Sequence, residues 1–377
     1  MIYLDNAATT KVLSEACEAA AYAMQSVWGN PSSLHRMGIE AERLVTYAKK
    51  QLLSALGDTS GDVIFTSGAT EGNNTAVFGL CKVYGKRKKR VVTTSVEHPS
   101  VAQPFQRLKD LGYEVVTVSP DKNGEITADS LISAVDDNTC LISAMLCNNE
   151  TGYILPISEA FAEIKRQHPD CMTHCDCVQG FEKLTVSAKK LSADVITLSG
   201  HKIYAPKGIG AMYVKKGVRL SPVFFGGGQQ KNLRSGTEAV PLIYSFGKAV
   251  EILTPTLKQR FDNAAKICEY AKAKLNEIGA VVISKDSASP YILSIAVPNI
   301  KSETILHFLE EDEIYVSSGS ACSKGKKSAV LKEFKISDQL LDSVIRLSFS
   351  FETQTSDIDA LVDKLGIGIK TLAKIKR

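Results

Sequence analysis

Short apolar runs alternate with amphipathic stretches through the first two-thirds of the chain, and this alternation limits the folds it can adopt. The pattern predicts helices over residues 69–84 and 100–111, and strands at 63–66, 91–94, 114–118, 140–146, 172–174, 194–198 and 210–214. Strands that alternate with helices are joined by right-handed crossovers and form a mostly parallel sheet covered on both faces. We therefore predict an α/β fold with a mostly parallel seven-stranded sheet, whose ligands lie beyond the carboxyl ends of the strands.

The pattern changes after the three glycines at 226–228. Residues 257–278 form a predicted long amphipathic helix, because apolar or small side chains recur at helical spacing: Phe261, Ala264, Cys268, Ala271, Leu275 and Ile278. Strand-like segments at 291–297 and 344–349 and helical segments at 303–311 and 356–365 follow. We predict a large domain over residues 16–253 and a smaller α+β domain made of residues 1–15 and 254–377.

The composition is that of an ordinary globular enzyme, with 44% hydrophobic and 23% charged residues. A net charge of +4 is small for 377 residues and argues against direct nucleic-acid binding, and the basic run at 86–90 is predicted to be a solvated loop. No apolar stretch approaches the roughly 18–20 residues of a membrane span, and the N-terminus lacks the features of a signal peptide. The sequence predicts a cytoplasmic protein without a membrane partner.

The nine cysteines are predicted to be thiols rather than a disulfide framework. Cys171, Cys175 and Cys177 lie close to His174, but their spacing lacks the second ligand pair of a metal site. We therefore expect no metal. Other cysteines in apolar surroundings, such as Cys140, are expected to be small core residues.

Lys202 is the leading candidate for chemistry. It ends the run SGHK at 199–202, directly after a buried strand, and proline and glycine follow at 206 and 208. An amine held in such a cleft is partly desolvated, which lowers its pKa toward neutrality and makes it a nucleophile able to form a Schiff base. The alternative is a loop lysine near a turn.

Several polar segments end other strands. The run FTSGATE at 65–71 leads into a helix N-terminus and suits a phosphate, although plain capping by Ser67 or Thr70 explains it too. Asp176 could pair with a protonated ring nitrogen and Gln179 could donate to a neighbouring oxygen, or Asp176 is a surface residue near a turn. The run NNETG at 148–152 offers amide donors in the same region.

Three more residues qualify by their surroundings. His98 could stack on a planar cofactor and move protons near neutral pH, or it is an ordinary loop histidine. Cys322 lies in the polar run SSGSACSKGKK at 317–327, whose lysines favour the thiolate, or it is a tolerated surface cysteine. Arg346 is a lone cation in an apolar strand, which suits either a bidentate grip on a carboxylate or a structural ion pair.

Together these segments resemble the cysteine desulfurases of the NifS/IscS type, in the class V aminotransferase family. The resemblance covers nearly the whole chain, and its motifs occur in the family's order: residues 3–10, 30–35, 65–71, 97–98, 148–152, 174–179, 199–210, 226–229, 234–237 and 318–322. The context SGSAC around Cys322 resembles the NifS/IscS group rather than the SufS group.

The resemblance implies a homodimer of fold type I that binds pyridoxal 5'-phosphate (PLP). Lys202 would hold the cofactor, Asp176 would pair with the pyridine nitrogen, and His98 would stack on the ring. Gln179 and Asn149 would bind the phenolic-oxygen side of the ring. The implied phosphate ligands are Ala69, Thr70, Ser199 and His201, with Thr237 reaching the phosphate of the partner subunit.

The resemblance also implies the reaction. Arg346, with Asn30, would bind the substrate L-cysteine, and Cys322 would take its sulfur as a persulfide and leave alanine. The sulfur would pass to an acceptor protein, either an iron–sulfur scaffold or a tRNA-thiolation protein. The alternatives are three. The protein could be a selenocysteine lyase, it could have some other class V aminotransferase activity, or it could be a non-catalytic sulfur carrier or metal-binding module.

Four positions depart from the family's pattern. Lys231 and Asn232 replace a common Arg-Gly pair, Ala239 stands where asparagine is frequent, and Ser350 replaces a glycine. We expect these changes to affect loop geometry near the site rather than the chemistry. The C-terminal extension with which longer relatives dock a scaffold looks short, which leaves the sulfur acceptor open.

Overall fold

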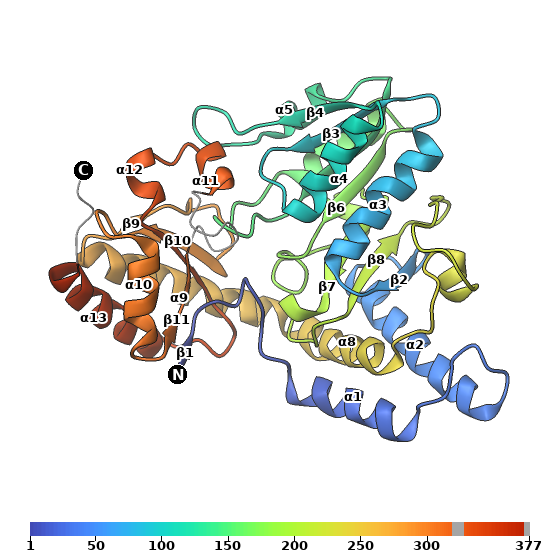
Figure 1. Cartoon of the computed structure of the whole chain (residues 1–377), viewed down its shortest axis with the longest axis horizontal. Helices are drawn as coiled ribbons and strands as arrows, with labels where there is room; N and C mark the ends of the chain where they lie inside the picture. The colour runs from blue at the N-terminus through green and yellow to red at the C-terminus, as the bar shows by residue number, and fades with distance from the viewer. Residues whose placement is uncertain (319–327, 373–377) are drawn as a thin grey trace.

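The computed structural model describes residues 1–318 and 328–372 and is built around a seven-stranded sheet (Figure 1). The strand order is β2-β8-β7-β6-β5-β3-β4, in which β8 runs antiparallel to both neighbours and the other pairs are parallel. The strands are β2 (Asp62–Thr66), β3 (Arg90–Thr94), β4 (Glu114–Val118), β5 (Thr139–Met145), β6 (Met172–Asp176), β7 (Val195–Ser199) and β8 (Gly210–Val214). The predicted mostly parallel α/β sheet is confirmed.

Both faces of this sheet are buried, as helical crossovers require. Side chains of a strand alternate between the faces, so Ile64 packs with the helices α3 (Ala69–Tyr84) and α4 (Pro99–Asp110), while its neighbour Val63 packs on the opposite side. The opposite face is covered by α1 (Ser14–Ser26), α2 (Arg36–Ala55), α5 (Ala128–Ser133), α6 (Ile157–Gln167), α7 (Ala188–Leu191) and α8 (Val240–Leu253). The sheet edge at which the sequence predicts a ligand is therefore held between two apolar layers.

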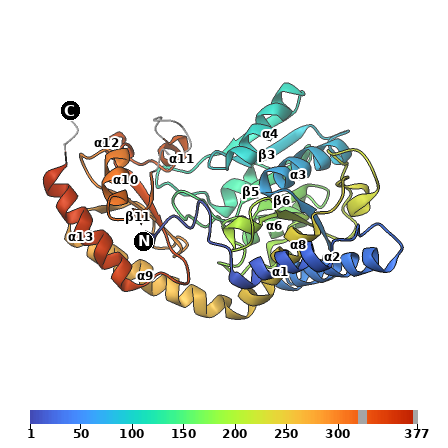
Figure 2. The ribbon, with the colours of Figure 1, turned by 60° about the horizontal axis from the view of Figure 1, so that its bottom comes forward.

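A second, four-stranded antiparallel sheet has its own apolar cluster. Its order is β12 (Ser317–Ser318), β13 (Val344–Ser348), β10 (Ile292–Ala296) and β9 (Val281–Val282). The long helices α9 (Leu257–Glu277), α10 (Ser302–Glu310) and α13 (Thr355–Thr371) pack against it, and α11 (Ala329–Glu333) and α12 (Asp338–Leu341) are short. The elements around this sheet, among them α10 and α13, lie to one side of the large sheet (Figure 2). The helices and strands expected after residue 254 are present within a few residues of the predicted bounds, except that α13 runs on to Thr371.

The N-terminal segment connects the two sheets. Strand β1 (Ile2–Tyr3) pairs in parallel with β11 (Ile314–Tyr315), and Asp5 forms a bridge with Ser348 of β13. The chain then passes to the end of β7, where the Thr10 N–H and hydroxyl both donate to the His201 carbonyl at 2.9 and 3.0 Å. Residues 2–10, called the N-terminal strap below, therefore touch both halves of the molecule. Within the described ranges, no helix is long and apolar enough to cross a membrane.

Candidate active site

Most of the predicted site residues lie along one edge of the seven-stranded sheet. Strands β6 and β7 end there at Asp176 and Ser199, and the antiparallel strand β8 begins there opposite Ser199. The parallel strands β3 and β5 end at the same edge, and the chain continues from them to His98 and Asn149. Because parallel strands present their carboxyl ends together, residues far apart in sequence converge at this edge.

Lys202 closes the short 3-10 helix η1 (Gly200–Lys202), directly after β7. Its Nζ donates to the carbonyl oxygens of Ala7 and Ala8, at 2.7 and 2.6 Å, and the side chain is half-buried. The N-terminal strap therefore fixes the direction of the amine. The role of this lysine stays a prediction, and its two carbonyl acceptors are contacts that the sequence motif did not predict.

Asp176 is buried at the end of β6. Its Oδ2 accepts a hydrogen bond from Asn73 Nδ2 at 2.8 Å and its Oδ1 accepts from the Val178 N–H at 3.0 Å. Burial raises the pKa of this carboxyl, while its hydrogen bonds and the nearby His98 and Lys202 act in the other direction. Asp176 is therefore an inward-facing acid rather than the surface residue of the alternative interpretation.

His98 caps the N-terminus of α4 and is joined to Asp176 by hydrogen bonds. The His98 Nδ1 accepts from the Ser100 N–H at 3.1 Å and lies 2.8 Å from Ser100 Oγ, which itself accepts from Asn73 Nδ2 at 2.8 Å. Since Nδ1 is an acceptor, the neutral ring carries its proton on Nε2. The protein packed around the ring lowers the pKa of His98, with Asp176 opposing and Lys202 reinforcing that shift.

A pocket opens beside His98 and reaches the first turn of α3. It is lined by Thr70, Asn74, Phe78, His98, Pro99, Ser100, Gln103, Pro104 and Arg107. Although the protein around it lowers its pKa, the His98 side chain is accessible from this pocket.

The N-terminus of α3 lies beside the start of β8 and the end of β7. Helix α3 starts at Ala69 after Gly68 without a side-chain cap, so capping by Ser67 or Thr70 does not explain the motif. A Cβ on Gly210 would lie 2.7 Å from the backbone of Gly68, so only glycine permits this close approach of β8 to the turn. Ser199 is the strand partner of Gly210. Its buried hydroxyl has no hydrogen-bond partner among the described residues.

His201 and Gln179 complete the edge. Burial and the positive charge of Lys202 lower the pKa of His201 to about 4, and its Nδ1 lies 3.3 Å from Thr9 Oγ1. Gln179 is buried, with Nε2 donating to the Ala7 carbonyl at 2.9 Å and Oε1 accepting from Lys183 Nζ at 3.0 Å. Both side chains therefore contact Lys202 or the strap residues that hold it.

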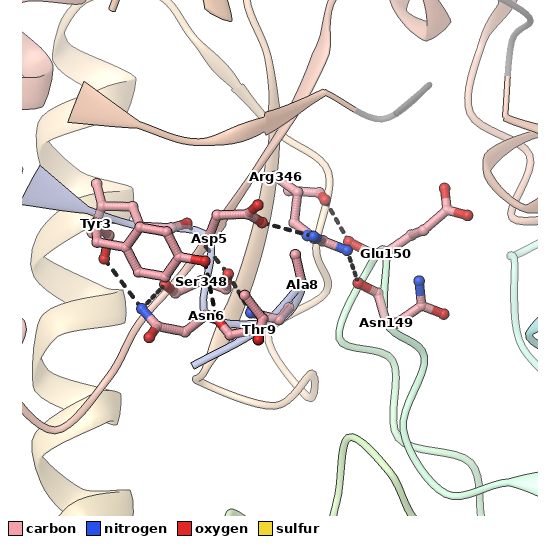
Figure 3. A network of polar contacts seen from close by, with 12 residues as sticks. Tyr3, Asp5, Asn6, Ala8, Thr9, Asn149, Glu150, Arg346 and Ser348 are labelled. Carbon is pink, nitrogen blue, oxygen red and sulfur yellow. Dashed lines mark hydrogen bonds and ion pairs between the residues drawn. The ribbon is translucent and has the colours of Figure 1, made fainter. Parts of the chain in front are cut away.

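Arg346 comes from β13 of the small sheet and points to the strap (Figure 3). Its two terminal nitrogens donate to the Asn149 carbonyl at 2.8 Å and to the Asp5 carboxylate at 2.9 Å. Arg346 is 9% exposed, and its Nε has no hydrogen-bond partner within the described ranges. The structural ion pair that the sequence left open is therefore present, beside the candidate site.

Two predicted residues lie apart from this group. Asn30 is exposed on the turn between α1 and α2, where its side chain accepts from the Ser32 N–H at 2.9 Å. Thr237 is exposed on the loop before α8. Neither forms a hydrogen bond to the Lys202 group in the part of the chain that the structure describes. Cys322 lies outside the described residues.

The cysteine cluster is packed in the core. Cys171, Cys175 and Cys177 are buried, and His174 bonds Ser143 Oγ at 2.7 Å and Thr197 Oγ1 at 3.0 Å. Burial lowers the pKa of His174 to about 3, which keeps the ring neutral. In residues 1–318 and 328–372, no three His, Cys, Asp or Glu side chains form a group that could hold a metal.

The departures from the family pattern have local explanations. Gln230, Lys231 and Asn232 all adopt left-handed backbone conformations, with φ of 48°, 55° and 63°. Asparagine tolerates this conformation better than most residues, so Asn232 can stand where glycine is common. Lys231 also forms an ion pair with Asp62 at 2.8 Å. Ala239 leaves α8 without a side-chain cap, and Ser350 accepts from the Glu352 N–H in a turn.

Four residues that form hydrogen bonds at the site were not predicted: Asn73, Lys183, and Ala7 and Ala8 through their carbonyls. Asn73 is a buried polar residue on the inner face of α3. A buried polar side chain marks a candidate site residue, but the sequence does not show that Asn73 is buried until the inward face of the helix is known. The carbonyls carry no side-chain signal at all. These groups orient the predicted residues rather than replace them.

Known proteins share this fold and these motifs. The chain matches the aminotransferase class-V family over residues 2–361. A NifS/IcsS protein homolog of Lactobacillus delbrueckii subsp. bulgaricus is 38% identical over 368 residues, which cover 96% of this chain and 95% of that protein. The cysteine desulfurase IscS of Dictyoglomus turgidum is 33% identical over 379 residues, which cover 99% and 96%.

Solved structures agree with the sequence relatives. A NifS-like protein superposes with a TM-score of 0.92 at 32% identity, covering 98% of this chain and 100% of that one. The chain therefore belongs to the class V aminotransferase family, and the predicted resemblance to the NifS and IscS cysteine desulfurases is confirmed.

Proposed function

We propose that this protein is a cysteine desulfurase that uses PLP to remove sulfur from L-cysteine, giving L-alanine and a persulfide on Cys322. The observation that carries the proposal is the convergence of Lys202, Asp176 and His98 at one sheet edge, in a chain whose relatives include cysteine desulfurases. The selenocysteine lyase and transaminase alternatives share the PLP residues, but neither needs the Cys322 thiol. A non-catalytic carrier has no use for Lys202.

The residues present fit PLP. The partnerless Ser199 hydroxyl lies at the start of a cradle formed with Ala69, Thr70 and His201, which supports a phosphate site there. The buried Asp176 carboxylate faces the same edge and supports a partner for a protonated ring nitrogen. His98 would cover one ring face, and Gln179 and Asn149 would serve the phenolic oxygen.

Each residue then has a task. When bound, PLP supplies an electron sink for the bonds at the substrate's Cα. Lys202 holds the cofactor and moves the proton at Cα, and Asp176 holds a proton on the ring nitrogen. Neutral His98 has Nδ1 engaged with Ser100 and can exchange a proton at Nε2. Arg346 binds the cysteine carboxylate, a step in which the substrate competes with Asp5 for the guanidinium.

Cys322 completes the reaction. Its thiolate attacks the sulfur of L-cysteine, the C–S bond breaks, and a proton goes to the former Cβ, so the products are alanine and Cys322 persulfide. The terminal sulfur is then passed to an acceptor protein, an iron–sulfur scaffold or a tRNA-thiolation protein. The role of Asn30 in substrate binding stays a prediction.

We infer a homodimer from the apolar surface between α1 and α2. Trp28 is 69% and Leu34 95% exposed in the single chain, and Met37 and Ile39 are exposed on the following turn. Burial of such residues against a second copy is favourable, and exposed Thr237 would then reach the phosphate of the partner subunit. Separate apolar clusters around the two sheets support the division into residues 16–253 and 1–15 with 254–377. The cytoplasmic location stays a prediction.

The test is product analysis with matched variants. Purified protein with PLP and L-cysteine should form alanine, and the peptide that carries Cys322 should gain one sulfur atom by mass spectrometry. Cys322→Ala should bind PLP but form no alanine, whereas Cys17→Ala, which removes an exposed thiol of α1, should retain full activity. Lys202→Ala should lose the visible absorbance of bound PLP.

Three outcomes would decide against the proposal. Full alanine formation by Cys322→Ala would move the nucleophile elsewhere. Rapid selenide release from selenocysteine with no sulfur transfer from cysteine would favour the lyase. Formation of a keto acid from cysteine, without alanine, would favour a transaminase.

A further inference from the structure

Lys183 is a buried lysine directly behind the candidate site. It is 4% exposed and lies in the helical turn that follows β6, seven residues after Asp176. Hydrogen bonds from the Phe181 N–H to the Cys177 carbonyl and from the Leu184 N–H to the Gly180 carbonyl build this turn. Side chains four residues apart lie on one face of such a turn, which brings Lys183 to Gln179.

The contact between the two residues fixes the direction of an amide. Lys183 Nζ donates to Gln179 Oε1 at 3.0 Å, and Gln179 Nε2 donates to the Ala7 carbonyl at 2.9 Å. In this contact Lys183 Nζ is the donor, so the amide atom beside it is the acceptor oxygen of Gln179 rather than the nitrogen. Gln179 must therefore present Nε2 toward the strap and Lys202.

With the amide of Gln179 in this orientation, one hydrogen of its Nε2 group remains for a ligand. The Nε2 group has two hydrogens, and the Ala7 carbonyl takes one of them. The Ala7 carbonyl also accepts from Lys202 Nζ at 2.7 Å, so the amide and the amine share an acceptor. The second Nε2 hydrogen is available to an oxygen bound next to Lys202.

We propose that Lys183 is a positioning residue for PLP, which acts by holding Gln179 with its amide nitrogen toward the phenolic oxygen. The proposal rests on the proposed function, because it needs PLP at Lys202. Lys183 itself touches neither substrate nor cofactor.

The surroundings explain why an amine can serve here. The titratable and charged groups that face Lys183 are Cys147 after β5, Lys202 in η1, Arg346 in β13 and Arg260 in α9. Burial, followed by the charge of Lys202, lowers the pKa of Lys183 to about 7. The carboxylate of Glu182, the residue before Lys183, forms an ion pair with Arg260 at 3.1 Å rather than with Lys183. Lys183 is thus engaged with an uncharged amide rather than with a carboxylate of its own turn.

The test is a double-mutant cycle on PLP binding, measured as the dissociation constant from the visible absorbance of the purified protein. Lys183→Met removes the donor, and we expect it to weaken binding roughly tenfold, the size of effect of one misplaced buried hydrogen bond. Lys183→Gln keeps an N–H donor at this position and should retain most of the affinity. Lys364→Met, a half-buried lysine of α13, is the matched control and should bind like wild type.

The cycle is closed in a Gln179→Leu background. If Lys183 acts through Gln179, adding Lys183→Met there changes the dissociation constant by less than about twofold. Replacing both partners of a hydrogen bond leaves neither partner unsatisfied. If circular dichroism shows that Lys183→Met alone does not fold, the PLP dissociation constant of the double variant can therefore still be compared with that of Gln179→Leu.

The outcomes separate the two claims. Wild-type protein that binds no PLP contradicts the proposed function. Wild-type protein that binds PLP, with Lys183→Met either unchanged or equally weakened in both backgrounds, overturns the role of Lys183. Equal losses in Lys183→Met and Lys183→Gln would overturn the need for a donor.

Discussion

At the scale of single residues, the site is a set of predicted side chains held by partners that the sequence does not mark. Lys202, Asp176 and His98 could be predicted because each follows a strand and carries reactive chemistry. Asn73 could not, because its importance comes from contacting Asp176 and Ser100 together, 103 and 27 residues away. Such pairs are set by tertiary packing rather than by spacing.

Asn73 offers a direct test of this linkage. Asn73→Leu keeps the volume but removes the bond to the Asp176 carboxylate, which is worth about 1.5–3 kcal/mol for a charged acceptor. We expect PLP affinity to fall tenfold or more, measured by absorbance titration. Asn263→Leu changes an exposed asparagine of α9, outside the candidate site, and should have little effect. Equal affinity in the two variants would remove Asn73 from the site.

Glu97 should make the stability of the protein depend on pH. Thr94 Oγ1 and the Met145 N–H donate to its Oε1, and burial raises the pKa of its carboxyl to about 8. The folded state therefore binds a proton that the unfolded state releases near pH 4.5, so Glu97 favours folding in acid and this contribution is lost as the pH rises through 8.

Glu97→Gln replaces the carboxyl with an amide that does not titrate. Relative to wild type, we expect the variant to gain stability between pH 5 and pH 9, as measured by urea unfolding midpoints of the cofactor-free proteins. Other titrating groups, such as Lys183, are common to both proteins and cancel in the difference. If the difference in unfolding midpoint between Glu97→Gln and wild type stayed constant from pH 5 to pH 9, Glu97 would be ionised in the folded protein.

At the scale of elements, the central strands were predicted within about two residues because runs of apolar side chains are buried on both faces. Helix α1 was not predicted. Its buried face is made of alanines, Ala16, Ala19, Ala20 and Ala23, which give a weak apolar period. The small side chains matter for another reason, since they allow α1 and α2 to pack closely with α8.

Helices α2 and α8 approach each other closely at Gly247 of α8, which lies against Ala48 of α2. A Cβ at this position would lie 2.6 Å from Ala48 Cα, so Gly247→Ala must push α2 and α8 apart and should destabilise by about 1–3 kcal/mol. Gly366 in α13 has 3.9 Å to its nearest neighbour. Gly366→Ala should therefore stabilise by up to about 1 kcal/mol through helix propensity. Thermal unfolding of both variants checks the contrast, and equal shifts would contradict it.

At the scale of the whole molecule, the fold class followed from the alternation of elements, but the joining of the two sheets did not. The N-terminal strap makes that joint with backbone groups and with Asp5, and nothing in its composition distinguishes it from an ordinary loop. The exposed surface at Trp28 and Leu34 was also not predicted, because exposure depends on where α1 and α2 end.

This surface gives the prediction at this scale. Leu34→Asp should convert the dimer to a monomer in light scattering and reduce PLP binding, since Thr237 would no longer reach the partner subunit. Ile367→Asp, at an exposed apolar position of α13, should remain dimeric. Trp28 is the sole tryptophan, so its fluorescence should shift to the red on dilution or in Leu34→Asp. Concentration-independent emission and mass for both variants would contradict the assignment of the interface.

The N-terminal strap also sets the order in which the protein can be completed during synthesis. Residues 2–7 leave the ribosome long before their partners, which include Ile314 and Ser348. At about 5–20 residues per second, roughly twenty to seventy seconds separate the two events. Lys202 is synthesised in between and receives its final acceptors, Ala7 and Ala8, only when the strap is anchored. A nascent chain released before Ser348 therefore holds a folded large sheet with an unfinished reaction centre.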